Sequence, residues 1–144
     1  MLSCQHPLLR VLVVDDHELT RFSLKLALAN QNNIQLVGLA SNGQEAIDMV
    51  ERHHPDVVIL DLQMPVMDGL SASTHIKSID PNTQIIAYSS VEDPQIEVMT
   101  QMARIDVFCK KDTATKDLIN LVQQLGHRKA SYLGGIANRS YTGQ

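Results

Sequence analysis

The sequence predicts an α/β fold in which a parallel sheet carries helices on both faces, and three observations lead to it. Five short apolar runs, several rich in Val and Ile, recur along the 144 residues. The runs are continuous rather than alternating, which is typical of strands buried on both faces. Segments with helical periodicity separate them, so a strand–helix unit repeats five times. Right-handed crossovers then place helices on both sides of an open sheet.

The elements follow one another at even spacing. Strands are predicted at the apolar runs, residues 8–14, 34–40, 56–62, 84–90 and 106–111. Helices are predicted between and after them, at residues 18–30, 42–53, 70–78, from Pro94 onward, and 113–126. Each helical segment carries apolar residues at helical spacing, as a helix packed on a core does.

Three of these helices carry further signals. In 18–30, the residues Leu19, Phe22, Leu26 and Ala29 form one apolar stripe, the kind that faces a core. Helix 42–53 is preceded by Ser41, which forms a capping box with Gln44. Gly126 stands where the last helix is expected to end.

Composition excludes several classes of protein. The formal net charge is -4, which argues against binding of nucleic acid through electrostatic attraction. No apolar run approaches the roughly 20 residues that a bilayer span requires. Cys4 and Cys109 cannot form a disulfide framework and lack the spacing of a zinc site. Reduced thiols and a cytoplasmic location are therefore expected.

Charged and hydroxyl side chains follow four of the five predicted strands. The first ends in Asp15-Asp16, the third in Asp61, the fourth in Ser89-Ser90 and the fifth in Lys110-Lys111. Open α/β sheets bind ligands beyond the carboxyl ends of their strands. Three carboxylates there would repel one another, and a divalent cation relieves that repulsion. Oxygen ligands suit Mg²⁺, and no His or Cys is expected at this edge.

These motifs resemble the receiver domain of two-component response regulators. The resemblance rests on VLVVDDHE, VVILDLQMPVMDG, IIAYSS and the Lys-Lys-Asp near residue 111, and it extends over residues 9–126. The opening VDDHELTR and the Asp112 after the lysine look like the NarL/FixJ-type subclass. The resemblance implies a flavodoxin-like (CheY-like) doubly wound fold whose five parallel strands have the order 2-1-3-4-5.

The resemblance also implies roles for individual residues. Asp61 matches the aspartate that accepts a phosphoryl group. Asp15 and Asp16 match the acidic pair that holds Mg²⁺, and the main-chain carbonyl of Gln63 matches a further metal ligand. Pro65, behind Asp61, belongs to the same motif.

Three more positions match residues that respond to the phosphoryl group. Ser89 matches the hydroxyl that moves toward it, with Ser90 as the alternative. Lys111 matches the lysine that pairs with it, with Lys110 as the alternative. Phe108 falls at the aromatic switch position, although it also fits an ordinary packing residue. Residues 104–107 read Arg-Ile-Asp-Val where the family usually has Gly-Ala-Asp-Gly, which removes backbone freedom there.

The expected function is that of a signalling switch and not of a classical enzyme. A sensor histidine kinase would donate the phosphoryl group, and the domain would catalyse its own Mg²⁺-dependent phosphorylation and dephosphorylation. The output would be a changed partner surface or a homodimer. Alternatives are a stand-alone receiver or a phosphorylation-independent interaction module; an aspartyl phosphatase lacks its second acid, since Gln63 stands there.

Three segments are expected along the chain. Residues 1–8 form an N-terminal arm, residues 9–126 the receiver domain and residues 127–144 a tail or linker. Such a linker would lead to the DNA-binding domain of a LuxR/NarL-type transcription regulator. Nucleic acid would be bound only through that domain, which this chain lacks, and no membrane contact is expected.

Overall fold

The computed structural model describes residues 8–64, 67–90 and 104–134, and side chains up to residue 127. Several predictions fall outside these residues. They concern the arm before Leu8, Cys4, Pro65, the helix expected from Pro94 and the last ten residues of the tail.

The sheet has five parallel strands in the order β2-β1-β3-β4-β5. The predicted fold class and strand order are therefore confirmed. The strands are the same length as predicted or slightly shorter, at Leu9–Val14 (β1), Ile34–Ala40 (β2), Val57–Asp61 (β3), Gln84–Ser89 (β4) and Val107–Lys110 (β5). Because β1 lies between β2 and β3, the winding reverses there, and a ligand site is expected beyond its carboxyl end.

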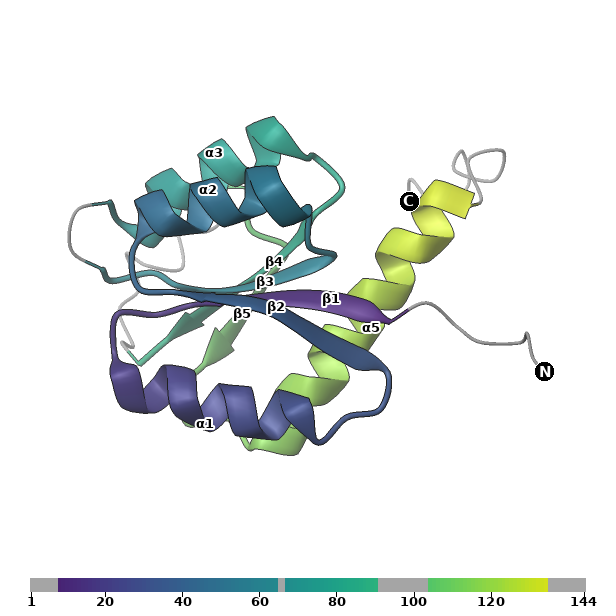
Figure 1. Cartoon of the computed structure of the whole chain (residues 1–144), viewed down its shortest axis with the longest axis horizontal. Helices are drawn as coiled ribbons and strands as arrows, with labels where there is room; N and C mark the ends of the chain where they lie inside the picture. The colour runs from purple at the N-terminus through teal and green to yellow at the C-terminus, as the bar shows by residue number, and fades with distance from the viewer. Residues whose placement is uncertain (1–7, 65–66, 91–103, 135–144) are drawn as a thin grey trace.

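Helices cover both faces of the sheet (Figure 1). The described helices are Glu18–Ala29 (α1), Gly43–His53 (α2), Gly69–Ile79 (α3) and Thr115–Gly134 (α5). Helices α1 and α5 lie on one face, and α2 and α3 on the other. Alternate residues of β1 serve the two cores, since Val11 and Val13 pack toward α1 and α5 while Leu12 and Val14 pack toward α2 and α3.

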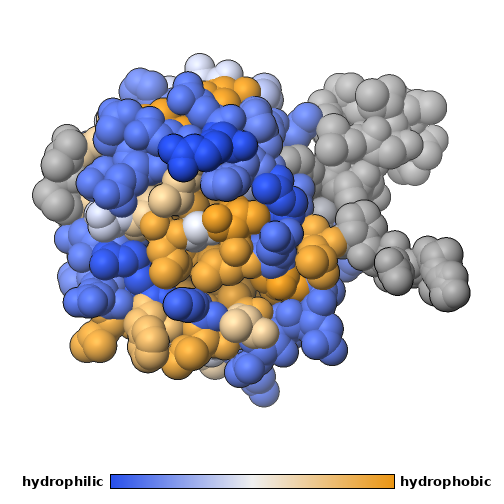
Figure 2. Space-filling model, in the orientation of Figure 1, coloured by the Kyte–Doolittle hydropathy of each residue, from blue (hydrophilic) through white to orange (hydrophobic). Residues whose placement is uncertain are grey.

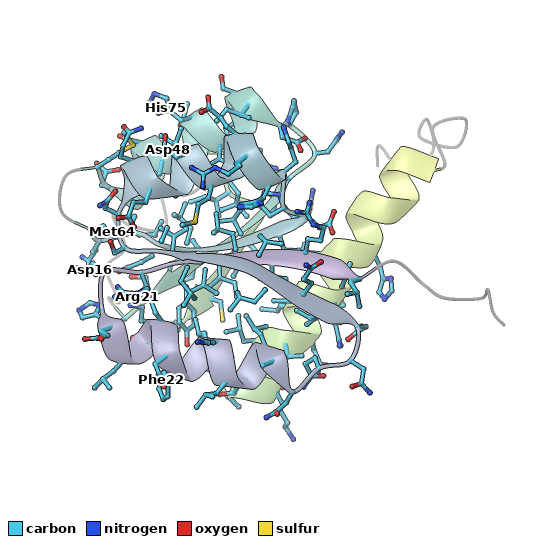
Figure 3. All side chains as sticks on the ribbon, viewed as in Figure 1. Asp16, Arg21, Phe22, Asp48, Met64 and His75 are labelled. Carbon is cyan, nitrogen blue, oxygen red and sulfur yellow. The ribbon has the colours of Figure 1, made fainter. Side chains whose placement is uncertain are left out.

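The predicted core stripe of α1 is wrong. Leu19 is 81% exposed, Phe22 is 54% exposed and Leu26 is 52% exposed, whereas Leu24 and Leu28 are buried against the sheet. The sequence of α1 offers apolar residues on two sides, and its docking on β1 and β2 selects the other side. Figure 2 shows apolar residues gathered at the surface near α1 and the β2 edge, and Figure 3 shows Phe22 pointing away from the sheet.

The cap of α2 also differs from the prediction, by one residue. Asn42 is the N-cap, and its side chain accepts a hydrogen bond from the backbone N–H of Glu45 at 2.9 Å. The Glu45 carboxylate in turn accepts from the backbone N–H of Ser41 at 2.8 Å and from its hydroxyl at 2.9 Å. The reciprocal capping therefore involves Asn42 and Glu45 instead of Ser41 and Gln44.

Gly126 does not end α5, which continues to Gly134. A Cβ atom at Gly126 would lie 2.7 Å from Cδ1 of Leu9. The glycine therefore lets the helix approach the start of β1 closely, and this contact explains its presence inside a helix. Residues 127–134, predicted as the start of a tail or linker, thus continue the helix. No described helix combines the length and the apolar character needed to cross a bilayer.

Candidate functional site

Three carboxylates from two neighbouring strands meet at the carboxyl edge of the sheet. Asp15 and Asp16 directly follow β1, and Asp61 is the last residue of β3. The two strands run parallel with Val14 opposite Leu60, so Asp15 and Asp61 emerge side by side. Asp15 is 1% exposed and Asp61 is 3% exposed. Figure 3 shows Asp16 at this edge of the molecule, at the level of the sheet between α1 and α2.

Backbone N–H groups just after β1 and β3 donate hydrogen bonds to one oxygen of each buried carboxylate. The backbone N–H of His17 donates to Oδ1 of Asp15 at 2.8 Å, and that of Gln63 donates to Oδ1 of Asp61 at 3.1 Å. Both are turns in which an Asp side chain accepts from the residue two positions ahead. Each turn holds its carboxylate in one orientation, and the second oxygen of each lies near the ammonium of Lys111.

Lys111 brings a positive charge to this cluster from β5. Its Nζ lies 2.7 Å from Oδ2 of Asp15 and 3.6 Å from Oδ2 of Asp61. It also lies 5.7 Å from the ring centroid of Tyr88. Lys110, the alternative in the sequence, is exposed. The structure thus brings Lys111 to Asp15 and Asp61.

The site holds more negative than positive charge. The pKa of Asp61 is raised to about 6: burial, the largest cause, and the nearby charge of Asp15 raise it, while the Gln63 N–H and the Lys111 ammonium lower it. Burial raises the pKa of a carboxyl group because it disfavours the ionised form. A single ammonium therefore does not compensate three crowded carboxylates.

The residues present fit a divalent cation. Ligand atoms of Asp15, Asp16, His17 and Asp61 all lie within 4.8 Å of one another. Oδ2 of Asp61 is buried and accepts no hydrogen bond from any described residue. A buried carboxylate oxygen without a donor is unfavourable, and a cation would satisfy it. This donor set could hold Mg²⁺ through carboxylate oxygens.

The other predicted residues are Ser89 at the end of β4, Gln63 just after β3 and Phe108 within β5. Ser89 is buried one position beyond Tyr88, which pairs with Asp61, whereas Ser90 is exposed. Gln63 contributes its N–H to Asp61, and a role for its carbonyl stays a prediction. Phe108 is half-buried on β5 opposite Ala87, and its switch role stays a prediction.

The altered loop before β5 is held by an ion pair. Asp106 lies 2.8 Å from Nζ of Lys77, a buried lysine of α3, and its Oδ2 accepts the backbone N–H of Ile85 at 2.8 Å. Ile105 packs against the core between the sheet and α2 and α3. In this chain, side-chain contacts thus hold the loop that lacks the usual glycines.

Sequence reasoning missed two residues of the site. The expectation that no histidine lies at this edge is wrong, because Nδ1 of His17 is 2.9 Å from Oδ1 of Asp15 and 3.1 Å from Oδ1 of Asp16. Its position directly after the acidic pair was the available signal. Arg21 was also missed; its Nη1 donates to the main-chain oxygen of Asp15 at 2.7 Å, one turn into α1.

The sequence matches one protein family over most of its length. Residues 11–123 match the family described as response regulator receiver domain. Response regulator protein VraR of Staphylococcus aureus is 34% identical over 117 residues, which make up 81% of this chain and 56% of that protein. The uncharacterized transcriptional regulatory protein YhcZ of Bacillus subtilis is 33% identical over 118 residues, or 82% of this chain and 55% of that protein. The chain spans about half the length of these relatives.

Solved structures of similar shape cover the same region. The signal receiver domain of NarL from Mycobacterium tuberculosis superposes with a TM-score of 0.80 at 29% identity, covering 85% of this chain and 98% of that one. The response regulator domain of Thermotoga maritima CheB superposes with a TM-score of 0.76 at 27% identity, covering 83% of this chain and 97% of that one.

Proposed function

The chain belongs to the response regulator receiver domain family, and we propose that its phosphoacceptor is Asp61. The observation that carries this proposal is the environment of the Asp61 carboxylate. It is buried, one oxygen is held by the Gln63 N–H, and the other faces Lys111 and two further carboxylates. A receiver domain of this kind is a switch in a two-component system and not a classical enzyme.

The transfer is a displacement at phosphorus. A carboxylate oxygen of Asp61 forms a bond to phosphorus while the bond from phosphorus to an imidazole nitrogen of the donor breaks, and that nitrogen keeps the electron pair. Asp15, Asp16, Asp61 and the Gln63 carbonyl would hold Mg²⁺, which would supply positive charge to neutralise phosphoryl oxygens. Hydrolysis of the product by water would return Asp61 to the carboxylate.

Lys111 and Ser89 stabilise the phosphorylated state. Lys111 lies near the carboxylates of both Asp15 and Asp61, so its ammonium can pair with an oxygen added on Asp61. Ser89 supplies a hydroxyl from the neighbouring strand β4. Movement of Ser89 toward the phosphoryl group, together with Phe108 on β5, would change the surface around β5 and α5. The resulting output is a changed partner surface or a homodimer.

A cytoplasmic sensor histidine kinase is the donor that fits this site. Such a donor must contact the surface around the carboxyl edge, and α1 presents an open groove there. Arg21 both lines this groove and donates to the Asp15 carbonyl, so the groove adjoins the acidic cluster. The exposed side chains of Leu19 and Phe22 give the donor an apolar contact.

The relatives suggest where the signal goes. YhcZ is named a transcriptional regulatory protein, and this chain covers about half of it. We therefore place this receiver in a LuxR/NarL-type transcription regulator, in which residues beyond 126 connect it to a DNA-binding domain. Nucleic acid would be bound by that domain, since the receiver itself carries a net negative charge.

Intact mass after incubation with a small phosphodonor tests the phosphoacceptor assignment. We expect a gain of one phosphoryl group in the presence of Mg²⁺ and none with a chelator. Asp61→Asn abolishes the gain. Asp48→Asn is the matched control, because Asp48 is an exposed carboxylate on α2. Retention of the full mass gain in Asp61→Asn would refute the assignment.

A further inference from the structure

His17 places a ring nitrogen against the acidic cluster although its ring is exposed. Nδ1 lies 2.9 Å from Oδ1 of Asp15, 3.1 Å from Oδ1 of Asp16 and 4.0 Å from Oδ2 of Asp61. The His17 side chain is 64% exposed, so burial does not dictate this orientation. The ring instead turns its nitrogen toward the place where the carboxylates converge.

These distances suit ligands of one metal ion. Two ligands at right angles around an octahedral ion, each about 2.1 Å from it, are roughly 3 Å apart. The separations from Nδ1 to the two Oδ1 atoms are close to that value. Asp61 adds a second observation, because its buried Oδ2 accepts no hydrogen bond from the described residues and lies 4.0 Å from Nδ1.

The chemistry of the donor atoms decides which ion is favoured. Mg²⁺ takes oxygen ligands almost without exception, whereas imidazole nitrogen suits ions such as Zn²⁺, Cu²⁺, Fe²⁺ and Ni²⁺, and Mn²⁺ is a first-row ion that also suits carboxylate oxygens. Adding a nitrogen ligand to a carboxylate site therefore strengthens binding of first-row transition ions relative to Mg²⁺. Among these ions, Mn²⁺ is the one that the carboxylate oxygens also suit.

We propose that His17 binds the metal through Nδ1 and thereby shifts the preference of this site from Mg²⁺ toward first-row transition ions, for which Mn²⁺ serves as the paramagnetic probe. The proposal rests on the metal-binding part of the proposed function, namely that Asp15, Asp16 and Asp61 hold a divalent cation. A nitrogen bound to a metal carries no proton, so the ring proton is on Nε2 in the metal-bound form. The competing role for His17 is a purely structural one, in which Nδ1–H donates to Asp15 and never contacts the ion.

Pulsed electron paramagnetic resonance of bound Mn²⁺ separates the two roles, because a directly coordinated ¹⁴N nucleus modulates the electron spin echo. We expect this ¹⁴N modulation in the unmodified protein and in His75→Ala. His75 is the matched control, an exposed histidine on α3 whose Nδ1 lies 3.0 Å from the Ser71 carbonyl oxygen. His17→Ala should still bind Mn²⁺ but should lose the modulation.

Titration of both metals completes the test. His17→Ala should weaken Mn²⁺ binding about tenfold, within the range for loss of a group around a metal site, and should change Mg²⁺ binding less than twofold. Bound Mn²⁺ without ¹⁴N modulation in the unmodified protein would overturn the role of His17 and leave the carboxylate site standing. Failure of the unmodified protein to bind either ion would instead refute the metal-binding part of the proposed function, and this proposal with it.

Discussion

Lys111, just after β5, holds its ammonium 2.7 Å from the carboxylate of Asp15, just after β1, although β3 and β4 lie between those strands. The side chain therefore reaches across the carboxyl edge of the sheet. Asp61, at the end of β3, lies between them with its Oδ2 at 3.6 Å from the same ammonium. Lys111 therefore approaches carboxylates that come from two different strands, β1 and β3.

Lys111→Met is expected to destabilise the metal-free protein at neutral pH. Three carboxylates then face one another without the ammonium, and the free energy of unfolding should fall by about 1–3 kcal/mol. Denaturant unfolding in the presence of a chelator measures this. Lys116→Met, at an exposed lysine of α5, should stay within about 0.5 kcal/mol of the unmodified protein. Equal losses for the two variants would contradict the assigned contacts.

Asp61 should make stability depend on pH. Its pKa is about 6 in the folded protein against an ordinary value of 3.8, so the folded state binds the proton more tightly than the unfolded state. The contribution of Asp61 therefore leaves the free energy of unfolding unchanged below about pH 4. That free energy falls as the pH rises further and stays low above about pH 6. Asp61→Asn, which does not titrate, should become more stable than the unmodified protein by about 1–3 kcal/mol across that window.

Unfolding curves of the metal-free proteins at several pH values check this difference. Added Mg²⁺ at pH above 7 should stabilise the unmodified protein and narrow the gap, because the ion binds the ionised carboxylate. If the difference in stability between Asp61→Asn and the unmodified protein is the same at every pH, Asp61 is not the group that makes stability depend on pH.

Gly69→Ala should disturb the loop that carries Asp61. A Cβ atom there would lie 2.6 Å from Cα of Leu62, and Gly69 donates its N–H to the Leu62 carbonyl at 3.1 Å. Backbone cannot yield as a side chain can, so we expect a loss of about 1–3 kcal/mol together with weaker metal binding. In Gly38→Ala the close atom belongs to the flexible Met49 side chain, so a smaller effect is expected. Calorimetric metal titration and denaturant unfolding measure both quantities.

The two sides of α1 should respond differently to substitution. Leu28 is buried, and Leu28→Ala is expected to lower the free energy of unfolding by about 2–5 kcal/mol. Phe22 is exposed, and Phe22→Ser should change it by no more than about 0.5 kcal/mol. Thermal or denaturant unfolding compares them. A large loss for Phe22→Ser would restore the stripe that the sequence suggested.

Phe22→Ser should nevertheless slow phosphorylation by a protein donor. Phe22 lines the groove on α1, and a kinase that docks there loses apolar contact area. The rate with a small phosphodonor should be unchanged, because such a donor needs only the carboxyl edge. Comparing the two rates in one preparation removes differences in folding. A parallel loss with both donors would argue against docking on α1.

The sequence predicts the sheet well because buried parallel strands are continuous apolar runs, as in Val57–Asp61. It also predicts which strand ends carry charge, and parallel strands bring those ends together. The sequence does not predict the packing of a helix when two of its faces fit the same apolar pattern. Both sides of α1 are apolar, and only packing on the sheet selects Leu24 and Leu28.

Gly126 and His17 illustrate a second limit. A glycine after an apolar helix indicates a stop, yet here it accommodates Leu9, which is remote in the sequence. A histidine after an acidic pair has no fixed direction, and the turn around Asp15 is what brings Nδ1 to the carboxylates. For Gly126 the deciding contact is tertiary, whereas for His17 it is the conformation of a local turn.

The most direct test of the central assignment locates the added phosphoryl group within the chain. Borohydride reduces an aspartyl phosphate to homoserine, and peptide mass spectrometry then identifies the modified position. After treatment with a small phosphodonor and Mg²⁺, we expect homoserine at position 61. Homoserine at position 15 or 16 with Asp61 unmodified would contradict the assignment.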